Sequence, residues 1–103
     1  MRVLVVGSGG REHALVWALQ RSPSAPEVFA APGNPGIAQA ALCFPIDPTE
    51  PALVAQLADD LDADLVVVGP EVPLVAGVAD AVRARGRHCF GPGVAGARAG
   101  STS

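Results

Sequence analysis

The chain has 103 residues, 50% of them hydrophobic and 17% charged, which predicts a single globular domain with a modest core. A formal net charge of -3 excludes the clustered cationic surface of a general nucleic-acid-binding protein. No apolar run reaches the roughly 20 residues of a transmembrane helix, and no signal-peptide pattern follows Met1, so we expect a cytoplasmic protein without membrane or nucleic-acid partners.

The first elements predicted are a strand, a helix and a second strand. Residues 2–6 form an apolar, largely β-branched run before a glycine cluster, which is typical of a strand buried on both faces. Residues 11–21 predict a helix that is apolar nearly all round. We expect this helix to be deeply covered and Trp17 to lie in the core. Residues 27–31 predict the next strand, and dense turn signals at 32–36 follow it.

The second half of the chain repeats this alternation. A third strand is predicted at 42–46, and an amphipathic helix covers 53–61 after an N-cap candidate in the segment Asp-Pro-Thr-Glu. Residues 64–68 give the clearest buried strand, 74–85 a helix that ends at a glycine, and 88–90 a last short strand.

Strands that alternate with helices through short connections predict right-handed βαβ crossovers. We therefore expect an α/β fold, namely a Rossmann-like open parallel sheet of about five strands with helices on both faces. The domain is expected to span residues 1–93, and residues 94–103 to form a polar tail without an element of its own.

The cysteines and the densest group of basic residues are interpreted as structural. Cys43 and Cys89 lack the spacing of a disulfide framework or a zinc site, and each lies beside a phenylalanine in an apolar segment. We expect reduced, buried thiols. Arg83, Arg85 and Arg87 are interpreted as a solvated helix end rather than a binding patch.

Three loops are candidates for a ligand site. Open parallel sheets bind ligands beyond the carboxyl ends of their strands, near the point where the strand order reverses. The segments 7–12, 32–36 and 69–73 are predicted to lie there. In the last of these, Glu71 stands between two prolines, and its carboxylate suits a hydroxyl, an amine or a magnesium-bound phosphate. It is equally interpreted as a loop-stabilising acceptor.

The first loop, Gly-Ser-Gly-Gly-Arg-Glu, is able to accept a phosphate or carbonyl group. Its glycines allow close approach, the following helix offers N–H groups, and Arg11 adds a bidentate cation. In the other interpretation, Gly9 and Gly10 serve close packing, and Arg11 and Glu12 are surface charges. The residues alone leave both open.

A dinucleotide site is disfavoured. The fingerprint requires a third glycine where this chain has Glu12, whose charge opposes a pyrophosphate. The strand at 27–31 also ends without the acid that holds a ribose, and no Gly-Lys-Ser or Gly-Lys-Thr occurs. Asn34 is a turn former or a ligand donor, and His13 is interpreted as structural.

Four motifs together resemble the phosphoribosylamine–glycine ligase family. They are, in chain order, RVLVVGSGGREH at 2–13, APGNPG at 31–36, VGPEVPL at 68–74 and FGP at 90–92. The resemblance implies a pre-ATP-grasp domain of an enzyme that joins glycine to 5-phosphoribosylamine in purine biosynthesis. It also implies that ATP and magnesium or manganese bind outside this fragment, on ATP-grasp domains of the same chain, and that the fragment alone is inactive.

The resemblance also implies which residues contact the substrate, while it places no catalytic and no metal-binding residue here. The substrate-binding positions carried over are Gly9, Gly10, Arg11, Glu12, Asn34, Gly36, Gly69, Pro70, Glu71 and Pro73. The family continues for about three times this length, and its usual Gly-Ser-Lys here ends in Thr102. The alternatives are a stand-alone nucleotide or dinucleotide-binding Rossmann module and a purely structural or oligomerising domain.

Overall fold

The computed structural model describes residues 1–23, 26–69, 72 and 75–91. Five parallel strands form one sheet, as expected from the sequence, and their order is β3-β2-β1-β4-β5. The strands are β1 (Arg2–Gly7), β2 (Glu27–Pro32), β3 (Leu42–Cys43), β4 (Leu65–Val68) and β5 (His88–Phe90). The helices are α1 (Gly10–Gln20), α2 (Pro35–Ala38), α3 (Pro51–Asp60) and α4 (Val75–Ala84).

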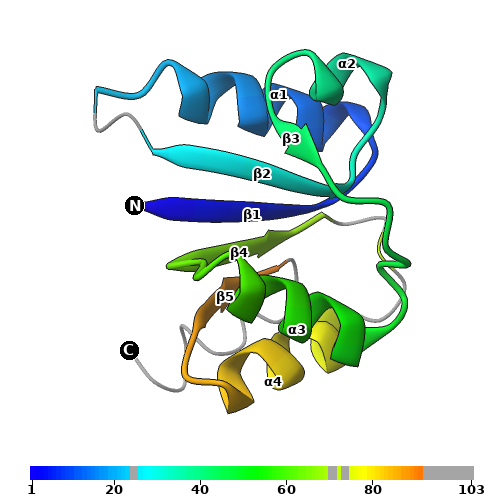
Figure 1. Ribbon diagram of the computed structural model, residues 1–103. Helices are drawn as coiled ribbons and strands as arrows, with labels where there is room; N and C mark the ends of the chain where they lie inside the picture. Colours follow the sequence, from blue (N-terminus) through cyan, green and yellow to red (C-terminus); the bar gives the residue numbers. More distant parts are fainter. Residues whose placement is uncertain (24–25, 70–71, 73–74, 92–103) are drawn as a thin grey trace.

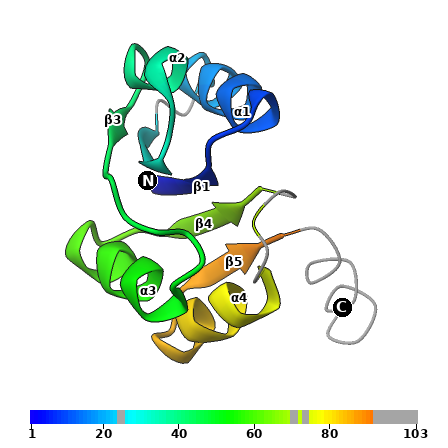
Figure 2. The same cartoon turned by 90° about the vertical axis from the view of Figure 1, so that its right-hand side faces the viewer.

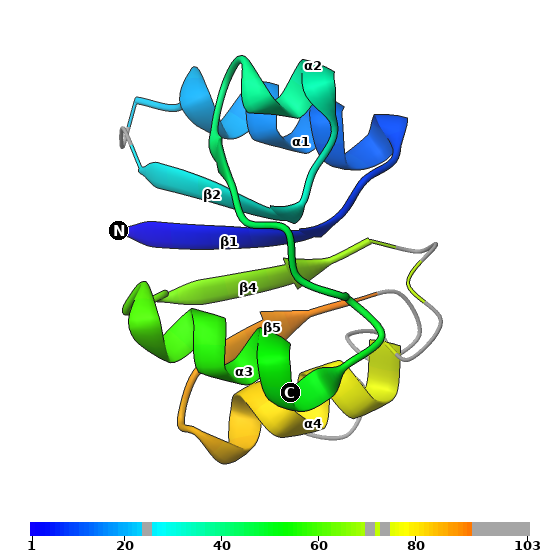
Figure 3. The ribbon, with the colours of Figure 1, turned by 45° about the vertical axis from the view of Figure 1, so that its right-hand side comes forward.

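The helices form two layers, one on each face of the sheet. Helices α1 and α2 lie on one side, and α3 and α4 lie on the other (Figure 1). The segment 44–50 crosses between them, from β3 at the edge of the sheet to α3 (Figure 3). The expected α/β fold with helices on both faces is therefore confirmed.

The central strand β1 supplies both layers of the core. Because successive side chains of a strand point to opposite faces, Val3 and Val5 pack in the α1 layer, whereas Leu4 and Val6 pack in the α3–α4 layer. All four are essentially buried. This explains why β1 is a continuous apolar run rather than an alternating one.

Helix α1 departs from the expectation of deep burial. It buries only Glu12 and Val16, and the side chain of Trp17 is 56% exposed instead of lying in the core. The guanidinium carbon of Arg21 lies 4.5 Å from the centre of the Trp17 ring. The prediction of a core tryptophan is wrong because an apolar helix covers the sheet with one face only.

Two local features differ from the sequence-based boundaries. Residues 35–38 form the short helix α2 inside a segment that was predicted to be a turn, with Asn34 as its N-cap and Pro35 in its first turn. Strand β3 ends at Cys43, short of the expected 46. Helix α3 begins at Pro51 after the N-cap Glu50, while Asp47 accepts hydrogen bonds from Thr49 one turn earlier.

The predicted buried thiols are confirmed for one cysteine. Cys89 is buried, and this burial raises the pKa of its thiol to about 11, whereas Cys43 is half-buried. Both are free thiols. Within the described segments no helix is long and apolar enough to cross a membrane. The predicted polar tail, 94–103, lies outside the described residues.

Candidate functional site

The three candidate loops meet at the carboxyl edge of the sheet. The first follows β1, the second follows β2 and the third follows β4. The strand order reverses between β1 and β4, since β2 lies on one side of β1 and β4 on the other (Figure 2). The crevice at this reversal is where open α/β sheets bind their ligands. The first and third loops flank it directly.

The buried carboxylate of Glu12 hydrogen-bonds to the backbone of the first loop. Its side chain is 3% exposed, and its Oε1 accepts a hydrogen bond of 2.8 Å from the amide of Gly9, the N-cap of α1. This is the carboxylate half of a capping box. Gly7 has a φ of 139°, and a Cβ there would lie 2.8 Å from the Glu12 carboxylate. The sequence therefore places glycine where the buried acid needs room.

Asn34 joins the second loop to the first. Its Nδ2 donates to the carbonyl of Ser8 at 2.6 Å, and its Oδ1 accepts from the amide of Ile37 at 2.8 Å. A further bond runs from the amide of Gly33 to the carbonyl of Gly7 at 3.1 Å. The Asn34 amide is thus occupied within the protein at both ends. This geometry corresponds to the turn-forming interpretation of the residue.

Gly36 allows close contact between the two loops. A Cβ on Gly36 would lie 2.7 Å from Cε1 of His13, so the imidazole of α1 packs directly against the first turn of α2. His13 therefore has a structural contact, as its sequence context suggested. The absence of a side chain at Gly36 is thus explained by its contact with His13.

The third loop is described only in part. The amide of Gly69 donates to the carbonyl of Val6 at 2.8 Å, which ties the end of β4 to β1. The neighbouring Val72 is buried. Three of the predicted contact residues, Pro70, Glu71 and Pro73, lie outside the described residues.

Gly10 and Arg11 are accessible at the carboxyl edge of the sheet. A Cβ on Gly10 would meet no atom within 4 Å, so packing does not require glycine there. No described residue forms a hydrogen bond to the amide of Gly10 or Arg11, as expected for the first turn of a helix. The Arg11 side chain is exposed and has no ion-pair partner among the described residues. Two N–H groups and one cation are therefore available to an anion.

The described residues do not fit a magnesium or ATP-phosphate site. No group of three or more His, Cys, Asp or Glu side chains comes together in the described part of the chain. The sequence also has no lysine to contact a triphosphate, and its first loop lacks the Walker pattern.

The three basic residues at the end of α4 make contacts within the protein, although Arg85 is exposed. Asp59 of α3 pairs with both Arg85 and Arg87, and the Arg87 Nε–Asp59 Oδ1 distance is 2.8 Å. These two guanidinium groups, Arg85 first, hold the pKa of the Asp59 carboxyl below its ordinary value. Arg83 donates to the carbonyl of Cys89 at 2.6 Å. The prediction of a solvated helix end holds for Arg85, whereas Arg83 and Arg87 are half-buried, and the contacts agree with a structural role for all three.

One contact of the site could not be found from the motifs, and another was missed although the sequence carried a signal for it. Ser8 contributes its backbone carbonyl to Asn34, a role that any residue type fills equally well. The burial of Glu12 did have a signal, because Glu at the third helical position is the capping-box position. That signal identifies Glu12 as a structural acceptor in addition to a candidate contact.

Comparison with known proteins agrees with this architecture. Residues 1–99 match the family described as "Phosphoribosylglycinamide synthetase, N domain". The chain is 56% identical over 98 residues to the phosphoribosylamine–glycine ligase of Mycobacterium tuberculosis, covering 95% of this chain and 23% of that protein. It is 51% identical, with the same coverage, to the ligase of Agrobacterium fabrum.

A solved structure supports the fold independently. It is titled "Structure of glycinamide-RNase-transformylase T from Mycobacterium tuberculosis" and superposes with a TM-score of 0.69 at 24% identity, over 86% of this chain and 26% of that one. The chain spans about a quarter of the length of the curated relatives that it matches. It belongs to the family of phosphoribosylglycinamide synthetase N domains.

Proposed function

We propose that this chain is the amino-terminal domain of a phosphoribosylamine–glycine ligase and forms the ribose-phosphate side of its active site. The complete enzyme would join glycine to 5-phosphoribosylamine with hydrolysis of ATP, in purine biosynthesis. Membership of the N-domain family and the names of the relatives support this assignment. Since the chain spans only about a quarter of those relatives, the domain alone would be inactive.

The observation that carries the proposal is the opening at Gly10 and Arg11. Both residues open α1 directly after β1, beside the reversal of strand order, and they bring two amide groups without a backbone partner and a guanidinium that no described residue pairs. Amide N–H groups and arginine are the donors that bind a phosphate. A ribose 5-phosphate moiety fits this combination because its charge lies in one compact group.

The remaining predicted residues fall into two groups, those that fix the loops and those that line the crevice. Glu12, Asn34 and Gly36 fix the loops through contacts within the protein. Gly9 and Gly69 supply backbone at the crevice, and Pro70, Glu71 and Pro73 complete the third loop. ATP and its metal ion would bind on the other domains of the complete enzyme, as the family resemblance implies.

Amide chemical-shift perturbation tests the proposal directly. The ¹⁵N-labelled chain is titrated in parallel with glycinamide ribonucleotide, ribose 5-phosphate, ATP and NAD. We expect shifts at 9–12, 33–36 and 69–73 with the two ribose phosphates alone. Shifts with NAD would favour the dinucleotide module instead, and silence with both ribose phosphates would contradict a site preformed in this domain.

Arg11→Ala should abolish the response to ribose 5-phosphate. Arg21→Ala is the matched control, because it removes the same charge from the other end of α1. In a complete ligase, Arg11→Ala should raise the KM for phosphoribosylamine much more than the KM for ATP. An equal rise in both would refute the assignment of Arg11 to the ribose-phosphate side.

A further inference from the structure

Helix α1 has a second apolar face that the described part of the domain leaves open. Its inner face carries Glu12 and Val16, with Leu15 and Leu19 partly buried against the sheet. On the outer face Trp17 is 56% exposed, and Ala14 and Ala18 are exposed beside it. A helix that is apolar all round is usually buried on all sides. The outer face therefore calls for a covering partner.

This outer face has a depression and side chains of the types found at interface centres. A shallow depression of about 350 Å³ runs along it, lined by Gly10, His13, Ala14 and Trp17. Arg21 stacks on the Trp17 ring and orients it. Tryptophan and arginine are the side chains that most often dominate binding energy at interfaces. We refer to this surface, Gly10, Ala14, Trp17, Ala18 and Arg21, as the α1 outer face.

We propose that the α1 outer face is the surface on which the rest of a phosphoribosylamine–glycine ligase polypeptide packs. The inference rests on the proposed function. The relatives extend far beyond the domain, because 98 matched residues make up only 23% of the Mycobacterium tuberculosis ligase. The depression begins at Gly10, so the segment that covers it also reaches the open part of the candidate site.

Charge argues against a second copy of this chain as the occupant. Arg11 and Arg21 stand at the two ends of α1, and the one acid of the helix, Glu12, is buried. Two copies packed face to face would bring cations together. The covering segment should instead be apolar at its centre and carry a carboxylate opposite Arg21, since Arg11 is left to the proposed phosphate site.

The α3–α4 layer offers a contrasting surface. Its ridge carries the Asp59–Arg85–Arg87 ion pairs and the exposed Gln56. Charged residues are depleted at the centres of interfaces. The exposed Leu53 of α3 is an isolated apolar side chain on this layer and makes a matched control.

Photo-cross-linking in a chimera tests the location of the interface. This chain replaces the matching 98 residues of the Mycobacterium tuberculosis ligase, and p-benzoylphenylalanine replaces either Trp17 or Leu53. We expect the probe at position 17 to join α1 to a peptide from outside the domain within the same chain. A cross-link between two chains, or none at position 17, would overturn the proposal.

A substitution measured in two contexts gives an independent readout. Trp17→Glu should lower Tm by about 3–5 °C in the chimera but by less than about 1 °C in the isolated chain, where the side chain is already exposed. Leu53→Glu should have the same small effect in both contexts. The inference would be overturned if Trp17→Glu lowered Tm equally in both contexts. It would also be overturned if Leu53→Glu lowered Tm in the chimera alone and by as much as Trp17→Glu.

Activity of the unmodified chimera separates this inference from the proposed function. An active chimera without the cross-link at position 17 would refute the α1 interface and leave the ligase assignment intact. A folded, inactive chimera with that cross-link would support the interface and refute the assignment.

Discussion

Helices α1 and α3 flank the same sheet on opposite faces, yet they use their apolar residues differently. Helix α3 turns Val54, Leu57 and Ala58 into the core beside α4, and its outer side is largely polar. Helix α1 buries Val16 and leaves Trp17, of similar apolar character, exposed. The difference teaches that the apolar content of a helix does not fix how many of its apolar side chains pack against its own domain.

A matched pair of truncations on α3 should show the largest contrast. Leu57 is 8% exposed and Leu53 is 46% exposed on the same helix. Leu57→Ala should lower the free energy of unfolding by about 2–5 kcal/mol because it leaves a cavity, and Leu53→Ala by less than about 1 kcal/mol. Urea denaturation of both variants measures the difference. Equal losses would mean that α3 is not packed as described.

Removal of the acid beneath the first loop should have the next largest effect. Glu12→Ala leaves the Gly9 amide without its acceptor, and we expect a loss of about 1–3 kcal/mol. Glu12→Gln keeps an oxygen acceptor and should lose less. Urea denaturation of the two variants compares them. If Glu12→Ala were as stable as the parent, the capping geometry of α1 would be contradicted.

Removal of the Asn34 side chain should lower the free energy of unfolding by somewhat less than removal of Glu12. Asn34→Ala removes the cap of α2 together with the bond to Ser8, for about 0.5–2 kcal/mol. Asn34→Asp keeps an acceptor for the Ile37 amide but loses the donor to Ser8. Hydrogen exchange of the Ile37 amide should therefore accelerate in Asn34→Ala and stay slow in Asn34→Asp. Fast exchange in both would show that the side chain does not cap α2.

The smallest effect should appear at low pH in the other layer. Arg85 and Arg87 hold the pKa of Asp59 below its ordinary value of 3.8, so the ionised form is favoured in the folded state. The resulting stabilisation is present above pH 3.8 and is lost as the pH falls through the lowered pKa of the folded state. Asp59→Asn should flatten that part of a stability–pH profile. An unchanged acid limb would contradict the ion pairs.

The strands were predictable because their signal is local. Residues 3–6 are buried on both faces of the sheet, and in β4 the buried Val66 and Val68 alternate with half-buried residues. An unbroken apolar run is sufficient to predict such strands. Helix α2 was missed although Asn34 followed by Pro35 is an N-cap and first-turn pattern. Four residues between turn formers gave too short a segment for helical periodicity to appear.

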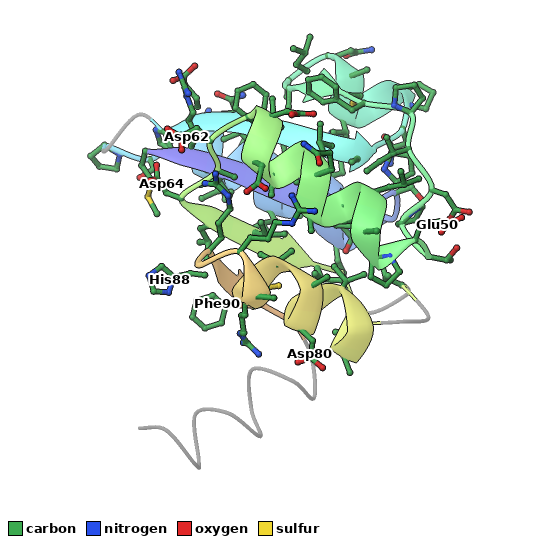
Figure 4. All side chains as sticks on the ribbon, turned by 60° about the horizontal axis from the view of Figure 1, so that its bottom comes forward. Glu50, Asp62, Asp64, Asp80, His88 and Phe90 are labelled. Atoms are coloured by element: carbon green, nitrogen blue, oxygen red, sulfur yellow. The ribbon has the colours of Figure 1, made fainter. Side chains whose placement is uncertain are left out.

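The candidate site was predictable in its position but not in its roles. Three loops at strand ends follow from the topology alone, and the structure brings the described parts of them together. The partners of Glu12 and Asn34 are tertiary contacts, so sequence left ligand binding and loop support as equal alternatives. On β5, His88 and Phe90 lie on the outside of the edge strand, where local pattern gives no information on exposure (Figure 4).

The carboxylate of Glu12 beneath Gly7 has a consequence for the speed and selectivity of recognition. Because folding itself fixes the first loop, the proposed anion would find the amides of the first turn already aligned, and little chain entropy would remain to be lost on binding. Such preorganisation favours rapid capture of small rigid groups over ligands that need the loop to adapt. The buried Glu12 would thereby help to select the ligand through the loop that it fixes.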